Sequence, residues 1–373
     1  MRILHIINDL RLAGAERFVA DLVPRQKELG LDVSVAVLAS YGSAFETKIR
    51  DAGIPLLMPD RPRPIRSPAH ILRLRKLFRE YDLVHVQLFP AQLWVALAAI
   101  SSGKSAPLLF TTEQNTHNTR RDIPAFRPVD RLMYSRYQHI AAISDGTRDA
   151  LVAYLPETAG KISVVHNGID PRRFTEPGSP EERTRLFPQV PASAPLLLCI
   201  GRLEPQKDFP NLLRAFARVP DAHLAVVGIG PLQPELEALA QTMAIRDRVH
   251  FLGKRDDIPA LLRNADLYVQ ASKWEGFGIA AVEAMASGLP LVVTDVPGLR
   301  EVVADAGVHV PSGDPDALAG AINALLTDPT QHETLSRRAR ERSRAFSITA
   351  SADAYRTLYE KLARERSGTA TLR

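Results

Sequence analysis

The chain has 373 residues, of which 45% are hydrophobic and 24% are charged, and its formal net charge is +5. This length exceeds what one hydrophobic core usually serves, so we expect two domains of an ordinary soluble globular protein. The single cysteine, Cys199, lies in an apolar run and excludes an internal disulfide, so the cytoplasm is the expected compartment.

The sequence carries no pattern typical of membrane insertion or secretion. The opening run Met1–Ile7 is too short and turns polar too early for a secretory signal. The apolar stretch Leu93–Ile100 is too short to span a bilayer. We therefore expect a cytoplasmic protein, with peripheral binding at the inner face of the membrane as the alternative.

Short β-type runs alternate with helical periodicity along the first half. The predicted strands are 3–7, 33–38, 83–86, 108–111, 139–142 and 163–165. The predicted helices are 16–29, 68–80, 90–101, 128–137 and 146–154. This alternation is typical of parallel sheets that are covered by helices on both faces.

The second half repeats the same rhythm. Strands are predicted at 196–200, 224–227, 249–251, 267–269 and 291–293. Helices are predicted at 209–219, 231–243, 258–264, 278–287, 316–326, 331–345 and 348–364.

A stretch rich in proline and charge separates the two halves, which is typical of a linker. We therefore expect an N-terminal Rossmann-like domain (1–168), a linker (169–194) with room for one short helix, and a C-terminal Rossmann-like domain (195–346). A helix and tail (347–373) follow, which can cross back to the first domain. Doubly wound domains bind ligands at the carboxyl ends of their strands.

The excess positive charge lies in the first 168 residues, and much of it falls within residues 61–79, where seven side chains are basic. Two interpretations remain open: a solvated helix face, or a patch for an anionic membrane surface or anionic acceptor. No nucleic-acid-binding motif accompanies the charge, so we expect no nucleic acid partner.

Two glycine-containing turns follow predicted strands. Gly14 opens the first helix, where backbone amides can approach an anion, although such a glycine is as often purely steric. Arg202 and Lys207 lie five residues apart on the loop after strand 196–200. A planar guanidinium and a compact ammonium suit a diphosphate, although surface loops also carry such pairs by chance.

The strongest motif places two carboxylates eight positions apart around a glycine-rich turn. Glu275 falls in a loop after a strand, and Glu283 falls on the following helix, which begins near Gly278. The free amides of Ile279 and Ala280 would face an anion at that helix terminus. The pattern therefore predicts one site for sugar hydroxyls, phosphate and a ribose hydroxyl.

Together these motifs resemble the retaining glycosyltransferases of family 4, also called glycosyltransferase group 1. The matching segments are GAERF (14–18), SDGTRDAL (144–151), HNGID (166–170), GRLEPQKDF (201–209), FLGKRDDI (251–258) and EGFGIAAVEAMASGLPLVVTDVPGLREVV (275–303). They occur in the family's order and span nearly the whole chain. The resemblance implies the GT-B fold, an α/β fold of two facing Rossmann-like domains with an interdomain cleft.

The resemblance also implies roles at matching positions. Arg202 and Lys207 would bind the donor diphosphate with the amides of Ile279 and Ala280. Glu275 would hold the donor sugar, and Glu283 the ribose. The other implied donor-binding residues are Phe251, Leu252 and Gly253 beside the base, Gly14 beneath the diphosphate or the acceptor, and Asn167.

The chain departs from the family at two places. Ala13 replaces the first glycine of the usual Gly-Gly-Ala-Glu turn, which weakens the assignment of Gly14. Gln114 occupies the position where the family usually has a histidine in the sugar pocket. We expect His117 to take over that role, with Glu113 as the alternative, although a lone histidine more often hydrogen-bonds only within its loop.

The expected reaction moves a sugar from a UDP- or GDP-sugar to an acceptor hydroxyl on a lipid-linked or glycan acceptor, in cell-surface polysaccharide or glycolipid assembly. No metal or cofactor is expected, because the cationic pair can stabilise the leaving diphosphate and no DxD motif lies in a suitable loop. The alternatives are a nucleotide-sugar epimerase or phosphorylase of the same fold, a non-catalytic scaffold, and a nicotinamide-dependent oxidoreductase, for which the GxGxxG pattern is absent.

Overall fold

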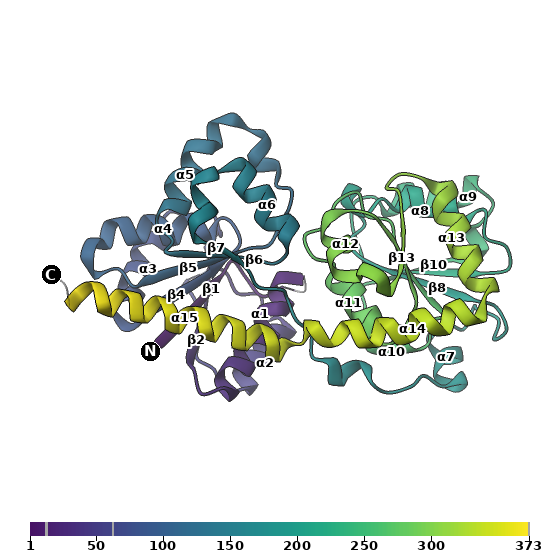
Figure 1. The fold of residues 1–373 in the computed structure, drawn as a ribbon, viewed down its shortest axis with the longest axis horizontal. Coiled ribbons are helices and arrows are strands. Elements are labelled where there is room, and N and C mark those ends of the chain that lie inside the picture. Colours follow the sequence, from purple (N-terminus) through teal and green to yellow (C-terminus); the bar gives the residue numbers. More distant parts are fainter. Residues whose placement is uncertain (12–13, 62, 372–373) are drawn as a thin grey trace. The chain divides into compact units, whose positions relative to one another are not determined.

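The predicted α/β class is confirmed in the computed structural model of the chain, which describes residues 1–11, 14–61 and 63–371. The chain forms two compact units. Unit 1 consists of Met1–Gly168 and Ile348–Arg373, and unit 2 consists of Ile169–Ser347. The two units are described separately below (Figure 1).

Unit 1 is built on a parallel sheet of seven strands in the order β3-β2-β1-β4-β5-β6-β7. The strands are β1 (Arg2–Ile7), β2 (Asp32–Val37), β3 (Leu56–Leu57), β4 (Leu83–Gln87), β5 (Leu108–Glu113), β6 (His139–Ala142) and β7 (Ile162–Val164). The helices are α1 (Gly14–Glu28), α2 (Ala44–Asp51), α3 (His70–Leu77), α4 (Ala91–Ser102), α5 (Arg127–Ser135), α6 (Asp145–Tyr154) and α15 (Ile348–Thr371).

Side-chain alternation along the strands fills a core on each face of this sheet. In β1, Ile3 and Ile7 join the core formed with α1, α2 and α15, whereas Leu4 and Ile6 join the core formed with α3, α4, α5 and α6. Both faces are therefore buried, which explains why the strands read as nearly continuous apolar runs.

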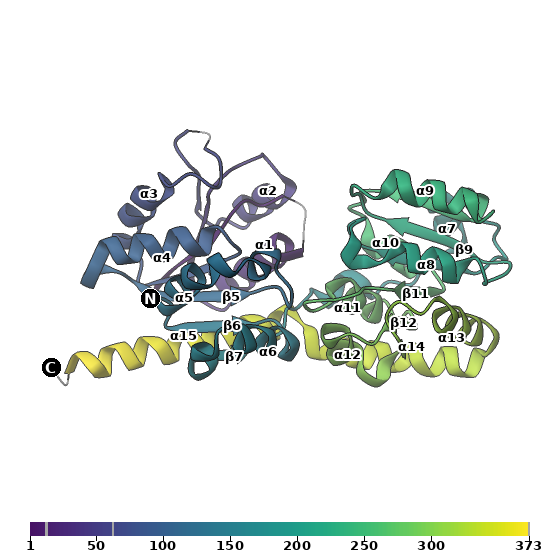
Figure 2. The same ribbon diagram turned by 90° about the horizontal axis from the view of Figure 1, so that it is seen from above.

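The last helix, α15, belongs to unit 1 and lies beside α1 (Figures 1 and 2). Tyr355 and Tyr359 of α15 are fully buried in the core beneath it. The Tyr359 hydroxyl lies 2.5 Å from Nδ1 of His85 in β4, and the Tyr355 hydroxyl lies 3.1 Å from Oγ1 of Thr112 in β5. Buried polar bonds therefore hold the end of the chain on the sheet.

Unit 2 is built on a parallel sheet of six strands in the order β10-β9-β8-β11-β12-β13. The strands are β8 (Leu196–Ile200), β9 (His223–Val227), β10 (Val249–Gly253), β11 (Leu267–Gln270), β12 (Leu291–Thr294) and β13 (Val308–Val310). The helices are α7 (Pro180–Leu186), α8 (Phe209–Phe216), α9 (Gln233–Thr242), α10 (Ile258–Arg263), α11 (Ile279–Ala286), α12 (Pro297–Val303), α13 (Pro315–Thr327) and α14 (Pro329–Ser343).

The segment 169–194, expected to be a linker, is instead part of unit 2. Its helix α7 is the one short helix for which the sequence left room. Glu182 accepts hydrogen bonds from Arg263 and Asn264, which lower the pKa of Glu182 to about 2. Arg183 pairs with Asp266 at 3.0 Å. The segment is thus anchored by polar contacts, which hydrophobic periodicity does not reveal.

Among the described residues, no helix is both long enough and apolar enough to cross a membrane.

Candidate functional site

The expected donor-binding residues of unit 2 lie along one edge of its sheet. Because all the strands are parallel, their carboxyl ends meet there: Gly253 ends β10, Gly228 follows β9, Gly201 follows β8 and Gln270 ends β11. Neighbouring ends are bonded to each other, since the Gly228 amide donates to the Gly253 carbonyl at 2.9 Å. This is the edge at which doubly wound sheets bind ligands.

A close approach of two backbones forms the floor of this edge. Gly228 has a φ of 141°, and a Cβ atom built on it would lie 1.9 Å from the carbonyl oxygen of Gly201. Only glycine fits there. The loop that begins at Gly201 and carries Lys207 therefore rests directly on the end of β9.

Lys207 and Glu275, from two different loops, form the centre of the site. The Lys207 ammonium donates to Glu275 Oε2, and the two side chains are 17% and 11% exposed. The same oxygen accepts from Gln270 Nε2 at 2.7 Å, while the Gly276 amide lies 3.3 Å from Oε1. The carboxylate is thus held in place by partners on either side of it, which fixes its geometry before any ligand binds.

Gln206, which the sequence analysis did not single out, ties these two loops together. Its carbonyl accepts from the Lys273 amide at 2.8 Å, and its side-chain Nε2 donates to the Trp274 carbonyl at 3.1 Å. Gln270 was also missed. A polar residue that ends an apolar strand, as Gln270 does in LYVQ, is a signal that could have found it.

Helix α11 begins beside Glu275, as the glycine-rich motif predicts. Gly278 precedes the helix with a φ of 90°, and a Cβ atom there would lie 2.7 Å from Leu299 Cδ2. Ile279 and Ala280 occupy the first turn, where helix amides lack acceptors within the helix, and both residues are half-buried. Glu283 lies one turn later and is 2% exposed.

Three further predicted donor residues of unit 2, Arg202, Phe251 and Gly253, lie on or beside the strands of this edge. The Arg202 side chain is 65% exposed, and its Nη1 lies 3.0 Å from Glu204 Oε1. Phe251 is half-buried against the core of unit 2, and the Arg246 guanidinium lies 5.9 Å from the centre of its ring. Gly253 follows it at the end of β10 with a φ of 64°.

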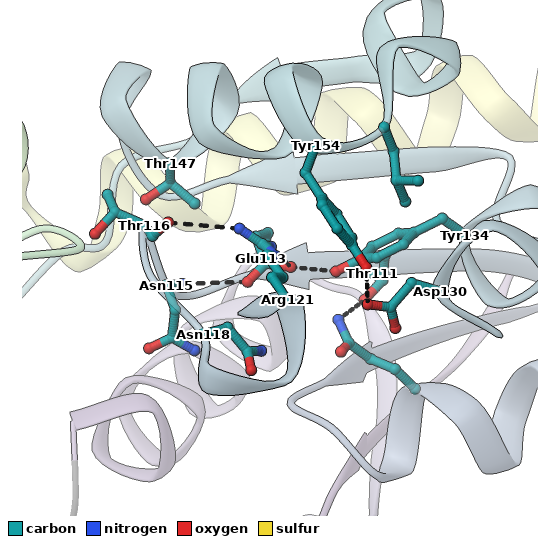
Figure 3. A network of polar contacts seen from close by, with 12 residues as sticks. Thr111, Glu113, Asn115, Thr116, Asn118, Arg121, Asp130, Tyr134, Thr147 and Tyr154 are labelled. Carbon is teal, nitrogen blue, oxygen red and sulfur yellow. Dashed lines mark hydrogen bonds and ion pairs between the residues drawn. The ribbon is translucent and has the colours of Figure 1, made fainter. Parts of the chain in front are cut away.

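In unit 1, the alternative catalytic residue Glu113 is enclosed by its own partners (Figure 3). It ends β5 and is only 4% exposed. The Tyr134 hydroxyl donates to its Oε2, Arg121 Nη2 lies 3.1 Å from the same oxygen, and the Asn115 amide lies 3.3 Å from Oε1. Burial and the Glu113 carboxylate raise the pKa of Tyr134 well above its usual value, so its hydroxyl stays protonated.

These contacts assign Glu113 an anchoring role for the loop that follows β5. Next to it, Arg120 pairs with the fully buried Asp130 at 2.9 Å, and Tyr154 donates to Asp130 at 3.3 Å. Figure 3 shows Asp130 with Tyr154 beside the contacts of Glu113. One buried ion pair therefore ties the loop to β5, and the other ties it to α5.

The structure separates the two candidates for the usual histidine position. Gln114 lies between two other amides at the carboxyl edge of the sheet. Its Nε2 donates to Gln87 Oε1 at 2.6 Å, and its Oε1 accepts from Asn167 Nδ2 at 3.1 Å. The His117 side chain is 47% exposed, and its Nε2 lies 3.4 Å from Asp122 within the same loop. The geometry favours Gln114 over the expected His117.

Gly14 is the first residue of α1 and is exposed, and a Cβ atom built on it would meet nothing within 4 Å. Packing within unit 1 therefore does not require a glycine at this position. Ala13, at which the chain departs from the usual glycine pair, lies outside the described residues.

We expect Gln114→Ala to lower kcat/KM for the expected sugar transfer by about tenfold or more, since a half-buried amide with two hydrogen bonds would be lost from the sheet edge. His117→Ala should stay within about threefold of the wild type. Steady-state kinetics of the two purified variants check this. A severe loss confined to His117→Ala would restore the histidine as the pocket residue.

The sequence is similar to known glycosyltransferases. Residues 12–173 match the family described as Glycosyltransferase Family 4, and residues 181–342 match Glycosyl transferases group 1. The lipopolysaccharide core biosynthesis mannosyltransferase LpsB of Rhizobium meliloti is 27% identical over 368 residues, covering 95% of both chains. An uncharacterized glycosyltransferase of Methanocaldococcus jannaschii is 31% identical, over only 56% of this chain and 55% of the relative.

Solved structures show the same fold. Anabaena HepE in complex with UDP and glucose superposes with a TM-score of 0.83 at 24% identity, covering 97% of this chain and 99% of that one. The two family matches together span both units, and the relatives and the fold agree with them. The chain is therefore an enzyme that belongs to the glycosyltransferases of family 4 and group 1.

Proposed function

We propose that the enzyme transfers a sugar from a nucleoside diphosphate sugar to an acceptor hydroxyl, with retention of the anomeric configuration. The observation that carries this proposal is the Lys207–Glu275 pair beside the start of α11, because it joins a cation, a carboxylate and helix amides at one sheet edge. The structures of HepE with UDP and with UDP-glucose support a nucleotide-sugar donor.

In this proposal different residues of unit 2 bind different parts of the nucleotide-sugar donor. Lys207, Arg202 and the first amides of α11 bind the diphosphate. Glu275 accepts hydrogen bonds from the sugar hydroxyls, Glu283 binds the ribose, and Phe251 and Gly253 border the base. Asn167 and Gln114 are proposed to bind a sugar at the sheet edge of unit 1.

The chemical step breaks the bond between sugar C1 and the diphosphate oxygen, and its electron pair leaves with the phosphate. The acceptor oxygen bonds to C1 on the same face, and its proton passes to the leaving phosphate. Negative charge thus develops on the diphosphate, and in this proposal Lys207 and the first amides of α11 stabilise that charge.

The first test is a panel of UDP- and GDP-sugars, scored for thermal stabilisation of the protein and for release of the free nucleotide. Ligand that binds only the folded protein raises its melting temperature. Binding of at least one nucleotide sugar, with release of nucleotide when acceptor is added, supports the proposal. Failure of every nucleotide sugar to bind would refute it.

We expect activity to survive exhaustive chelation with EDTA. The reason is that Lys207, Arg202 and the amides of Ile279 and Ala280 supply positive charge at the leaving group. The measurement is the initial rate before and after chelation. A rate that vanishes with EDTA and returns with added Mg²⁺ or Mn²⁺ would contradict this mechanism.

The acceptor is proposed to be a lipid-linked or glycan acceptor of cell-surface polysaccharide or glycolipid assembly. Relatives named for lipopolysaccharide core biosynthesis support this class. Helix α3 supplies a surface that would bring the enzyme to an anionic bilayer. Leu74 and Phe78 pack into unit 1, whereas Leu72 is 65% exposed on the opposite side.

The exposed face of α3 is basic. Arg75 and Lys76 of α3, and Arg79 of the 3₁₀ turn that follows it (Phe78–Glu80), lie at helical spacing from Leu72 and are all exposed. Arg73 is different, because its guanidinium donates to the Val37 and Leu57 carbonyls at 2.7 and 2.8 Å. Each basic side chain near an anionic surface contributes about 1 kcal/mol, so this face supports weak, salt-sensitive docking.

We therefore expect sedimentation with anionic but not neutral vesicles at low salt, and release at high salt. The variant in which Arg75, Lys76 and Arg79 are all changed to Gln should lose this binding, while Arg73 is retained to keep its structural bonds. Equal sedimentation of the wild type and this variant, or no binding of the wild type, would show that the face is only solvated.

A further inference from the structure

Three side-chain amides form a chain along the carboxyl edge of the sheet in unit 1. Gln87 ends β4, Gln114 follows β5 and Asn167 follows β7. Gln114 donates to Gln87 at 2.6 Å and accepts from Asn167 at 3.1 Å. Gln87 is fully buried and Asn167 is 5% exposed.

The series of polar side-chain contacts continues from Gln87 into the interior of unit 1. Gln87 Nε2 lies 3.5 Å from His85 Nε2, which also lies 2.7 Å from Thr112 Oγ1. The other ring nitrogen of His85 lies 2.5 Å from the Tyr359 hydroxyl of α15. A continuous line of polar contacts thus connects the C-terminal helix to the edge that carries Gln114.

The position of the proton on the His85 ring determines in which direction the three amides donate their hydrogen bonds. A neutral imidazole has one N–H group, and burial lowers the pKa of His85 well below its usual value. With the proton on Nδ1, facing Tyr359, Nε2 is an acceptor, which takes the Thr112 hydroxyl at 2.7 Å and faces the NH₂ group of Gln87 at 3.5 Å. The Gln87 oxygen then faces the Gln114 NH₂ group, and the Gln114 oxygen faces the NH₂ group of Asn167.

When the amides donate in this direction, one hydrogen-bond acceptor at the end of the series, on Asn167, is left without a donor. Asn167 Oδ1 is buried and has no hydrogen-bond partner among the described residues. A buried amide oxygen without a donor is costly, and a ligand hydroxyl could satisfy it.

We propose that Gln87 is a positioning residue, which together with His85 orients Gln114 and Asn167 so that Asn167 Oδ1 accepts a hydrogen bond from a sugar hydroxyl. This inference rests on the proposed function, because the ligand is a sugar that takes part in the transfer reaction. Gln87 itself does not contact the ligand. Its influence passes through Gln114.

The test is Gln87→Met, which keeps the length and volume of the side chain and removes both polar contacts. Gln92→Met is the matched control, because Gln92 is a 3% exposed glutamine of the same unit that donates to Thr111 at 2.9 Å, outside this chain. We expect Gln87→Met to lower kcat/KM about tenfold, and Gln92→Met to stay within about threefold at a similar loss of stability.

A second variant separates positioning from simple packing. Gln87→Glu keeps an oxygen that can accept from Gln114, so it should retain more of kcat/KM than Gln87→Met does. If Gln87 were only a packing residue, the buried charge would make the glutamate variant the worse one. Affinity for the free nucleoside diphosphate should stay within about twofold in each variant, since its proposed contacts lie in unit 2.

A measurement without ligand tests this inference independently of the proposed function. The ¹⁵N spectrum of the histidine rings, with the His85 signals identified from His85→Gln, should show a neutral ring protonated at Nδ1. Protonation at Nε2 instead would overturn the proposed direction of the chain. Unchanged kcat/KM in Gln87→Met, or equal losses in the Gln92 control, would overturn the positioning role. A wild type inactive with every nucleotide sugar would instead refute the proposed function.

Discussion

Lys207→Ala and Glu275→Ala are each expected to lower kcat/KM by about 100-fold or more while the fold stays intact, as is usual when transition-state electrostatics are lost. Lys207 supplies the half-buried cation at the proposed diphosphate position, and Glu275 is the carboxylate proposed to orient the sugar. The fold should survive because Glu275 keeps its contacts with Gln270 and Gly276 when Lys207 is removed.

The matched control for this pair is Lys273→Ala. Lys273 lies on the same loop as Glu275, but its side chain is 50% exposed and pairs with Asp208 at 3.5 Å. It should change kcat/KM by no more than about threefold. The double variant lacking both Lys207 and Glu275 should lose less than the sum of the two single losses, because the two groups act together. Near-normal kcat/KM in both single variants would contradict the assignment.

The second large effect concerns stability in acid. Burial lowers the pKa of His5 to about 4, and burial together with the neighbouring His5 lowers the pKa of His85 well below its usual value. Their rings lie 4.9 Å apart, and His5 Nε2 lies 2.7 Å from Gln26 Oε1. Both histidines therefore stay neutral in the folded protein at a pH where the unfolded chain binds protons.

The sign follows from these depressed values. Well above pH 6.5, His5 and His85 are neutral in both the folded and the unfolded state, so their burial does not reduce the free energy of unfolding. As the pH falls from 6.5 towards 4, the histidines bind protons in the unfolded state but not in the folded state, and the free energy of unfolding decreases. His5 alone accounts for about 3 kcal/mol of this loss, and His85 adds to it.

Urea unfolding at several pH values between 7 and 4 measures this loss. Carboxylates also titrate in that range, so the comparison with His5→Gln isolates the histidine contribution. The variant should lose less free energy of unfolding on acidification than the wild type. Identical pH dependence in the two proteins would contradict the buried neutral state of His5.

Much of the fold could be predicted from the sequence because its strands are apolar on both faces. The alternation of strands and helices predicted two doubly wound sheets, but the short strands β3 and β13 and the helices α2 and α12 were missed. β3 has only two residues, and His309 interrupts the apolar pattern of the three-residue β13. The polar contacts of Glu182 and Arg183 explain why 169–194 looked like a linker.

The site divides in the same way. Lys207 and Glu275 could be predicted because each lies after a strand in a motif, and the structure brings them into contact. The roles of Gln206 and Gln87 depend on which loop or strand lies next to them, which one sequence does not show. The choice between Gln114 and His117 also depends on side-chain direction, and only the structure reveals that Gln114 joins the amides at the sheet edge.

The most direct measurement is release of nucleoside diphosphate from the best donor of the sugar panel, with acceptor present, by the wild type and by Glu275→Ala in EDTA. Coupled detection of the released nucleotide and mass analysis of the glycosylated acceptor report the same reaction. The account predicts acceptor-dependent release by the wild type and a rate lower by about 100-fold or more in the variant. Nucleotide release that does not depend on acceptor, or equal rates in the two proteins, would contradict transfer at this site.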